Sequence, residues 1–215
     1  MAEVDPITTG PTSKKVLAAA KACLVDGGYA TLSTRRIAEQ AGVPLSQIHY
    51  HFGSKKSLLL AVLAADNARL LERQAEMYGD DVPLWKRWEQ ACDFLDEDLA
   101  SGYVRVLHEM IAAGWSDDEI AHEVRGSLQG WYVLLADVAR AAANRFGGLG
   151  PLEADDVAVL VGNAFLGSEA LILLGFSEGE LGSRAALRRV GELIRLADDG
   201  GRHSGTHRAT RTGGR

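Results

Sequence analysis

Apolar residues recur every three or four positions along most of this 215-residue chain, a spacing that places them on one side of an α-helix. The longest example lies between residues 120 and 146, where the apolar positions are Ile120, Val124, Leu128, Trp131, Leu135, Val138, Ala142 and Phe146. Prolines are few, and no run of β-branched and aromatic residues alternates with polar ones over the length of a strand. The sequence therefore predicts an all-α fold of about nine helices.

Gly, Pro and Ser residues mark where these helices begin and end. The expected helices cover residues 12–26, 34–40, 45–52, 54–78, 84–100, 103–112, 116–146, 153–174 and 183–197. Gly27 and Gly28 are expected to end the first helix, and Ser33 is expected to cap the second. Ser116 followed by Glu119 predicts a capping box at the start of the seventh helix.

The helices fall into two expected domains between polar chain ends. Residues 1–10 and 200–215 contain little apolar surface to bury, so we expect both segments to be disordered. Three helices in residues 11–56 form a compact head with the pattern of a helix-turn-helix. A long helix then joins this head to a larger helical domain that covers residues 57–199.

Charge is distributed unevenly between these parts. The net charge is −6, yet residues 1–60 carry seven Lys or Arg side chains against four acidic ones. Residues 61–200 carry twelve basic and twenty-five acidic side chains, whereas the tail has four Arg and no acid. A basic segment in an otherwise acidic chain suggests a polyanionic partner, although an excess of this size can also arise by chance.

Several features favour a cytoplasmic protein. The first ten residues lack the basic and apolar regions of a secretory signal, and no charge-free segment reaches the length of a bilayer span. No membrane association is therefore expected. Cys23 and Cys92 lie in apolar helical patterns without CxxC spacing, so we expect two buried free thiols. A disulfide between them is possible in principle but has no support in the sequence.

The stretch from residue 32 to residue 60, LSTRRIAEQAGVPLSQIHYHFGSKKSLLL, carries the most specific chemistry. Gly42 supplies the backbone freedom that a sharp turn between two short helices needs, and Val43 fills the angle between them. A turn of three or four residues that contains Gly is typical of a DNA-binding helix-turn-helix. With Ile48 and Phe52 facing inward, the polar side chains of the second short helix face outward.

Those outward residue types suit a DNA groove. Gln47 can bond adenine bidentately, Ser46 can bond either base edge, and Leu45 can contact a thymine methyl group. The cations at the surrounding helix starts suit contacts to phosphate, as do the free N–H groups of those helix ends. These cations are Arg35, Arg36, Lys55 and Lys56.

The same segment resembles the TetR family of bacterial regulators. The family pattern is matched by Ser33, Arg35, Ile37-Ala38, Ala41-Gly42-Val43, Tyr50-His51-Phe52, Ser54-Lys55 and Leu58. The chain departs from that pattern at three positions. It has Pro44 where the family often has a Ser cap, Ser46 where the family often has Gly, and His49 where the family usually has Tyr. The resemblance and the exposed chemistry together predict DNA contacts from Ser33, Thr34, Arg35, Arg36, Pro44, Leu45, Ser46, Gln47, His49, Tyr50, His51 and Lys55.

The resemblance also implies that residues 57–199 form a ligand-binding and dimerisation domain. Aromatic and polar residues in apolar surroundings predict a pocket for a small-molecule effector of unknown identity. Its expected residues are Trp88, Tyr103, His108, Trp131, Phe165 and Glu169. Glu169, a carboxylate in an apolar helix, could contact the ligand, pair with Arg140 or Arg184, or lie at a dimer edge.

A homodimer is expected because the helix over 153–174 is apolar on most sides and needs more cover than one bundle supplies. The expected interface residues are Leu160, Leu166, Leu171, Leu187, Val190 and Ile194. Two copies would place two recognition helices on successive turns of a palindromic double-stranded DNA operator.

These observations predict a sequence-specific DNA-binding repressor that a small-molecule effector releases from its operator. A small helical enzyme is the alternative, but the sequence contains no HExxH, GxxxxGK[ST] or GxSxG motif and no Cys/His cluster, so no cofactor is expected. His49 and His51 are two positions apart on a helix and face different sides, which argues against a metal pair. A helical adaptor without a DNA-binding role is the third hypothesis.

Overall fold

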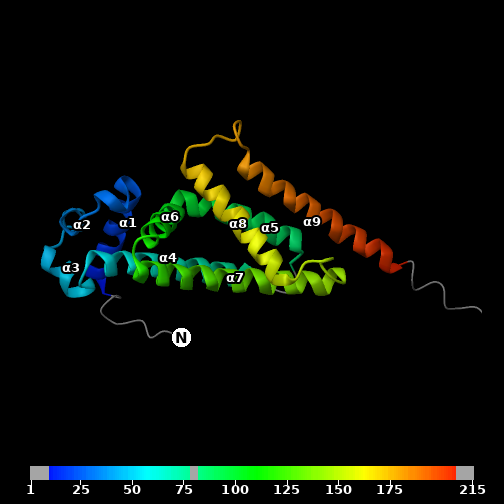
Figure 1. Cartoon of the computed structure of the whole chain (residues 1–215), viewed down its shortest axis with the longest axis horizontal. Helices are drawn as coiled ribbons and strands as arrows, with labels where there is room; N and C mark the ends of the chain where they lie inside the picture. Colours follow the sequence, from blue (N-terminus) through cyan, green and yellow to red (C-terminus); the bar gives the residue numbers. More distant parts are fainter. Residues whose placement is uncertain (1–9, 78–81, 207–215) are drawn as a thin grey trace, which may run out of the picture. The chain divides into compact units, whose positions relative to one another are not determined.

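The computed structural model describes residues 10–77 and 82–206, and within these ranges every regular element is an α-helix. This result confirms the predicted all-α fold, and Figure 1 shows the order of the helices. The nine described helices are α1 (Pro11–Thr31), α2 (Thr34–Ala41), α3 (Leu45–Phe52), α4 (Lys55–Met77), α5 (Leu84–Ser101), α6 (Tyr103–Gly114), α7 (Asp118–Phe146), α8 (Ala154–Leu173) and α9 (Ser183–Thr206).

The first helix differs from its predicted course. Gly27 and Gly28 were expected to end it, but α1 continues to Thr31 across a kink at Gly28, whose φ is 71° and ψ is 175°. This positive φ is readily adopted by Gly and strained for other residues. The helix resumes after the kink because Gly28 interrupts only one step of the backbone, so Tyr29 to Thr31 form a short separate turn.

Two other helix ends also differ from expectation. The predicted capping box at Ser116 is wrong, because Asp117 Oδ1 accepts the N–H groups of Glu119 and Ile120, at 3.1 and 3.2 Å. At the C-terminus, α9 extends to Thr206, so residues 200–206 of the tail that was expected to be disordered are helical. The rest of that tail, residues 207–215, and residues 1–9 of the N-terminal segment lie outside the described residues.

The chain divides into two compact units, and helices α4, α5 and α7 each contribute to both. The first unit consists of Met1–Glu72 and Asp98–Gln129, and it joins the predicted head to α6 and the first part of α7. The domain boundary after residue 56 stays a prediction. The fully buried side chains of this unit include those of Val16, Leu24, Ile37, Ile48, Leu58, Leu59, Leu63, Val104, Val106, Met110 and Ile120.

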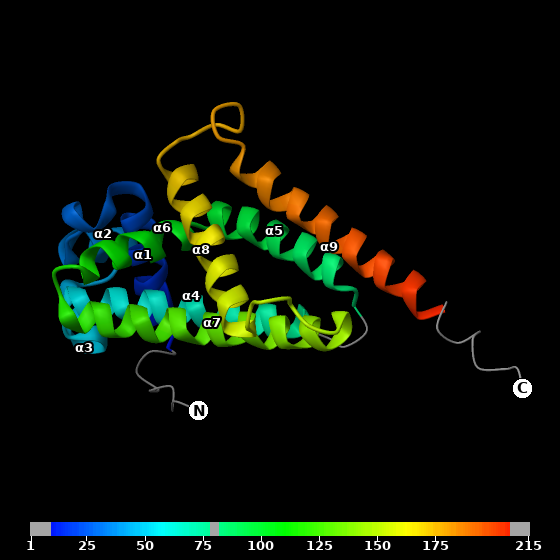
Figure 2. The same cartoon turned by 45° about the vertical axis from the view of Figure 1, so that its right-hand side comes forward.

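The second unit consists of Arg73–Glu97 and Gly130–Arg215. Within it, α5 runs alongside α9 (Figure 2), and the indole N–H of Trp88 donates to the carbonyl oxygen of Leu187 at 2.7 Å. Gly191 permits this approach, since a Cβ there would lie 3.0 Å from Trp88 Cδ1. Arg184 and Arg188 add ion pairs from α9 to carboxylates of α5. These contacts decide which side of α9 is buried within the unit.

Helix α8 forms a second layer of this unit. Its buried stripe consists of Ala158, Gly162, Phe165 and Glu169, and the Phe165 ring meets Trp88 edge to face at 5.6 Å between centroids. By length and composition alone, α8 is the one helix among the described residues that is long and apolar enough to cross a membrane, although it carries Asp155, Asp156 and Glu169 and is therefore not a charge-free segment. A core helix of a soluble protein passes the same test, so this result alone does not indicate a membrane span.

Candidate nucleic-acid interface

The turn between α2 and α3 has the geometry of the predicted helix-turn-helix. Gly42 ends α2 in the left-handed conformation, with φ 63° and ψ 37°, and the Val43 N–H donates back to the Ala38 carbonyl at 3.1 Å. At the other end of α2, Ser33 acts as the predicted cap, since its hydroxyl accepts the Arg36 N–H at 3.2 Å. The two helices are packed through Ile37, Ala38, Ile48 and Phe52, all of which are buried.

This packing fixes which side of α3 is available to a partner. The outward side carries Leu45, Ser46, His49 and Tyr50, and the Tyr50 side chain is 74% exposed. Gln47 and His51 flank this side and are half-buried, so Gln47 lies at the edge of the face rather than at its centre. Pro44, which enters the helix, is exposed as well. We call the surface formed by Leu45, Ser46, His49 and Tyr50 the α3 face.

The N-terminus of α3 leaves backbone donors available. Pro44 precedes it and gives no side-chain cap, so the N–H groups of Leu45 and Ser46 have no partner from a capping side chain. The Gln47 N–H is already used, because it donates to the Pro44 carbonyl at 2.9 Å. Unsatisfied N–H groups and the positive end of the helix dipole favour an anion at such a helix start. At the other end of α3, His49 Nδ1 lies 3.1 Å from the Gly53 carbonyl oxygen.

The cations expected to contact phosphate are not equally available. Lys55 Nζ donates to the carbonyl oxygens of Leu32 and Tyr29, at 3.1 and 3.4 Å, and lies 4.5 Å from the centroid of the Tyr29 ring. Arg36 is paired with Asp26. Arg35 is exposed and has no ion pair among the described residues. The structure thus gives Lys55 an internal role that the sequence did not reveal.

Lys56 also has partners within the first unit. Its ammonium lies 3.0 Å from Asp117 and 2.6 Å from Glu119, which ties the start of α4 to the start of α7. Hydrogen bonds to Glu119 and Asp117 raise the pKa of Lys56, and the bond from Lys56 is the main cause that lowers the pKa of Asp117.

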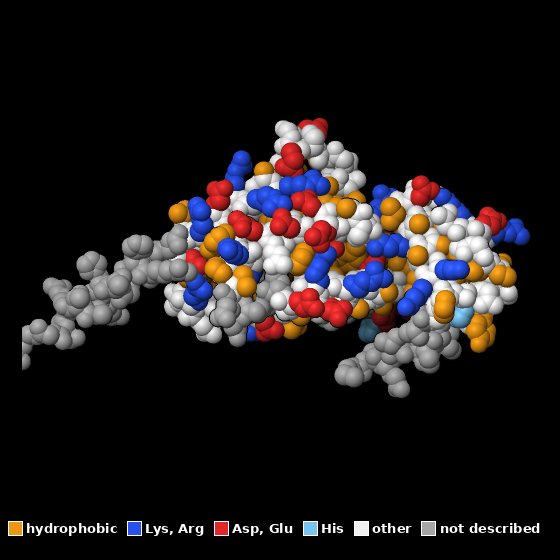
Figure 3. Space-filling view, turned by 180° about the vertical axis from the view of Figure 1, so that it is seen from behind, with side chains coloured by type: hydrophobic (Ala, Val, Ile, Leu, Met, Phe, Trp, Pro, Cys, Tyr) orange, Lys and Arg blue, Asp and Glu red, His pale blue; other side chains and the backbone are white. Residues whose placement is uncertain are grey.

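Figure 3 shows that Lys and Arg side chains on the face in view are interspersed with Asp and Glu rather than gathered in one patch.

The predicted effector residues are divided between the two units. Tyr103 and His108 lie on α6 in the first unit, where Tyr103 is buried and His108 half-buried. The second unit contains Trp88, Trp131, Phe165 and Glu169. The structure brings Trp88 and Phe165 together as packed rings, so both act in the core of the second unit. The six-residue pocket remains a prediction.

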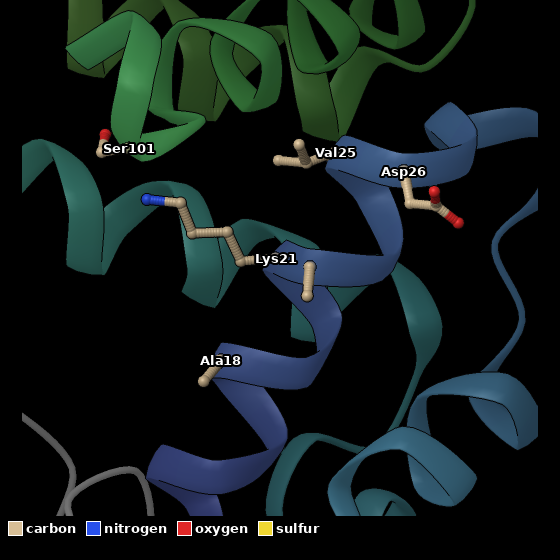
Figure 4. Close-up of a pocket in the computed structure, with 6 residues that line it drawn as sticks. Ala18, Lys21, Val25, Asp26 and Ser101 are labelled. Atoms are coloured by element: carbon tan, nitrogen blue, oxygen red, sulfur yellow. The ribbon is translucent and has the colours of Figure 1, made fainter. Parts of the chain in front are cut away.

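A hollow lies elsewhere, between α1 and Ser101 at the end of α5. It is lined by Ala18, Lys21, Ala22, Val25, Asp26 and Ser101, and Figure 4 shows Lys21 and Val25 projecting from α1 with Ser101 across from them. Lys21 is paired with Asp66 at 2.8 Å, and Asp26 is paired with Arg36. None of the predicted effector residues lines this hollow, and its charged groups already have partners.

The predicted interface residues also separate into two groups. Leu187 is buried within the second unit, whereas Leu160 is 59% exposed and Val190 is exposed as well. Leu166, Leu171 and Ile194 are half-buried. The exposed apolar side of these helices also includes residues that were not among those predicted, namely Val159, Leu193 and Leu196. Val190, Leu193 and Leu196 follow one another at intervals of three residues along α9, and this spacing was the signal that could have identified Leu193 and Leu196.

Comparison with known proteins agrees with this geometry. Residues 16–62, which contain the helix-turn-helix, match the model of a family described as bacterial regulatory proteins, tetR family. Residues 16–62 of this chain therefore resemble the N-terminal domain of TetR-family regulators. The HTH-type transcriptional repressor AcnR of Corynebacterium efficiens is 35% identical to this chain over 63 residues, and AcnR of Corynebacterium glutamicum is 35% identical over 68 residues. The alignments cover 29% and 31% of this chain and 34% and 36% of the two repressors, so the chain matches about a third of the length of these curated relatives.

Solved structures extend the likeness to the whole fold. A TetR transcription regulator from Haloarcula marismortui superposes with a TM-score of 0.71 at 19% identity, over 85% of this chain and 95% of that one. The regulator FadR from Bacillus subtilis, solved in complex with stearoyl-CoA, gives a TM-score of 0.70 at 16% identity, over 84% and 96% of the two chains. At these identities the likeness establishes the TetR-type fold of this chain.

Proposed function

We propose that this chain is a cytoplasmic, non-enzymatic transcriptional regulator of the TetR family that binds a specific DNA operator through the α3 face. The observation that carries the proposal is the helix-turn-helix, in which buried Ile48 and Phe52 hold α3 so that Leu45, Ser46, His49 and Tyr50 point outward. An α-helix fits the major groove of B-DNA, where polar side chains and a Leu side chain can read base edges and thymine methyl groups. Backbone donors at the start of α3 and the exposed Arg35 would contact phosphates.

The test is a selection of genomic DNA fragments by the purified full chain, followed by anisotropy titrations of the best fragment and of random DNA. Specific binding should exceed random binding by roughly three orders of magnitude or more at physiological salt and should weaken steeply as salt rises. Tyr50→Ala should lose affinity for the selected fragment while keeping its fold, because the ring is exposed. Equal affinity for random DNA would contradict the proposal.

We propose further that the regulator acts as a homodimer formed by α8 and α9. Exposed apolar side chains of both helices support this proposal, with Leu193 and Leu196 at 65% and 64% exposure and Leu160 at 59%. Large exposed apolar patches mark sites of protein–protein interaction. A second copy would cover it with the same surface in a two-fold arrangement, and two heads would then match a palindromic operator.

Light scattering after size-exclusion chromatography tests the dimer. Leu160→Glu places a charge on the exposed side of α8 and should convert the dimer to a monomer, with a marked loss of operator affinity because only one head then binds. Trp115→Glu is the matched control, since Trp115 is also exposed but lies in the first unit. A wild-type monomer that binds the operator with full affinity would exclude this arrangement.

We propose that repression is relieved by a small-molecule effector bound in the larger helical domain. The predicted residues Trp88, Tyr103, His108, Trp131, Phe165 and Glu169 are the first candidates for contact, and the FadR complex with stearoyl-CoA supports the idea that this fold can hold a ligand. A thermal-shift screen followed by operator release tests the proposal. An effector must bind the DNA-free state more tightly to cause release, so a compound that stabilises the protein without reducing operator affinity is not the effector.

A further inference from the structure

The backbone of Tyr29, in the last turn of α1 just after the kink at Gly28, is held from two sides. Its N–H donates to Glu109 Oε2 of α6 at 2.9 Å, and its carbonyl oxygen accepts a bond from Lys55 of α4 at 3.4 Å. The same lysine donates to the carbonyl of Leu32 at 3.1 Å. Residues 29–33 are the last turn of α1 after the kink and the two residues that lead to α2, and we call them the α1–α2 connector. One carboxylate and one ammonium hold this segment.

The backbone at Gly28 is shaped to admit the carboxylate. Gly28 has a φ of 71°, and a Cβ at this position would lie 3.0 Å from Glu109 Oε1. The kink also exposes the Tyr29 N–H, which a continuous helix would have directed to a carbonyl four residues earlier. Glycine at this position thus serves both the positive φ and the close approach of Glu109.

Glu109 is itself held in place by α6. Arg105, one turn earlier, donates to Glu109 Oε1 through Nε at 3.0 Å and lies 2.9 Å from it through Nη2. The side chain of Glu109 is 23% exposed, so water competes weakly for the carboxylate. One carboxylate oxygen is therefore fixed by Arg105, and the other is directed at the connector.

From this geometry we propose that Glu109 is a positioning residue for DNA binding. It touches no base and no phosphate; its carboxylate sets the path of the α1–α2 connector, and the connector sets where Ser33 begins α2 and thus how the α3 face is presented. Withdrawal of the carboxylate lets the connector relax, which lowers operator affinity while α2 and α3 stay folded. This inference rests on the proposed DNA-binding function.

The direction in which operator affinity changes distinguishes a positioning role of Glu109 from a purely electrostatic one. DNA is a polyanion, so removal of an acidic side chain reduces long-range repulsion and by itself strengthens binding. A positioning role for Glu109 predicts the opposite: its removal weakens binding. Glu123 on α7 provides the matched comparison, since it is exposed, lies in the same unit and has no ion pair among the described residues.

The experiment compares Glu109→Ala, Glu109→Gln and Glu123→Ala in the full chain, with the best genomic fragment from the selection as the probe. Glu109→Ala should bind about tenfold more weakly, which corresponds to about 1.4 kcal/mol and is of the order of a hydrogen bond to a charged group. Glu109→Gln keeps an acceptor for the Tyr29 N–H and should recover most of the affinity. Glu123→Ala should bind at least as tightly as the wild type.

Hydrogen exchange of the DNA-free protein provides a second readout that does not depend on operator binding. Exchange at the α1–α2 connector should accelerate in Glu109→Ala, whereas the amides of α2 and α3 should keep their protection. Unchanged exchange at the connector, or affinity in Glu109→Ala equal to that in Glu123→Ala, would overturn the inference. Failure of the proposed function would instead appear in the wild type, as a lack of preference for the selected fragment over random DNA.

Discussion

Replacement of Lys55 and of Arg35, each by glutamine, separates a cation that holds the fold from one that we propose contacts DNA. Both substitutions remove one positive charge from the head. The Lys55 ammonium donates to the carbonyl oxygens of Tyr29 and Leu32 and lies over the Tyr29 ring, whereas Arg35 is exposed without an ion pair among the described residues. The two variants should therefore differ in which measurement they change.

The size of each effect follows from these interactions. A hydrogen bond from a charged donor contributes roughly 1.5–3 kcal/mol when buried, and partial exposure of Lys55 reduces the pair to about 1–2 kcal/mol in total. In a chain of this size that lowers the melting temperature by roughly 3–6 °C. Arg35→Gln should leave the melting temperature unchanged. Removal of one phosphate contact should instead reduce the magnitude of the slope of log K against log salt by about 0.9, or by roughly 1.8 for a dimer with two heads.

Thermal unfolding and anisotropy titrations between about 50 and 200 mM salt measure both quantities on the same preparations. Lys55→Gln should melt earlier and keep the wild-type salt slope, and Arg35→Gln should melt with the wild type and show a smaller slope. If Lys55→Gln reduces the slope as much as Arg35→Gln does, at unchanged stability, then Lys55 contacts phosphate and its bonds to the connector are energetically unimportant.

Three further substitutions test the packing. Burial raises the pKa of Cys92 to about 11, so the thiol should resist alkylation until the protein unfolds. Because this folded pKa lies above the unfolded one, the free energy of unfolding should be full below about pH 9 and should fall towards pH 11. Cys92→Ala should reduce this pH dependence. Gly102→Ala should destabilise by roughly 2–3 kcal/mol in urea unfolding, because φ is +80° and the new Cβ would lie 2.6 Å from Val25 Cγ2; Val25→Ala in the same chain should restore part of the loss. Gly191→Ala should push the Trp88 indole away from the Leu187 carbonyl, seen as a change in tryptophan fluorescence, and an unchanged spectrum would argue against the packing of α5 on α9.

Local features of the helix-turn-helix could be predicted because their causes lie within a few residues. Gly42 ends α2 because its own backbone adopts the left-handed conformation, and Ser33 caps α2 because its hydroxyl accepts the Arg36 N–H. The spacing of apolar residues by three or four positions predicts that Ile48 and Phe52 are buried, as they are. Interactions of this kind depend on sequence neighbours alone, so a sequence pattern contains most of the information they require.

Partners that come from distant parts of the chain could not be predicted in the same way. Lys56 meets Asp117 across 61 positions, and the Tyr29 N–H meets Glu109 across 80. On α9, Leu187 and Leu193 have the same chemistry, yet one is buried and the other exposed. The difference arises because Trp88 approaches α9 on the side of Gly191, an approach set by tertiary packing.

The internal use of cations limits the ways in which the head could bind DNA in the proposed function. A count of basic residues suggests four phosphate contacts around α3, but Lys55, Lys56 and Arg36 bind carbonyl or carboxylate oxygens of the protein itself. Only a cation without such a partner can release counterions from DNA at no loss to the fold. In the proposed complex the remaining contacts would come from backbone donors at the start of α3 and from the polar α3 face, whose hydrogen bonds depend on orientation. Affinity in such a head is therefore more sensitive to the position of α3 than to net charge, which is the condition under which a single carboxylate at the α1–α2 connector can control binding.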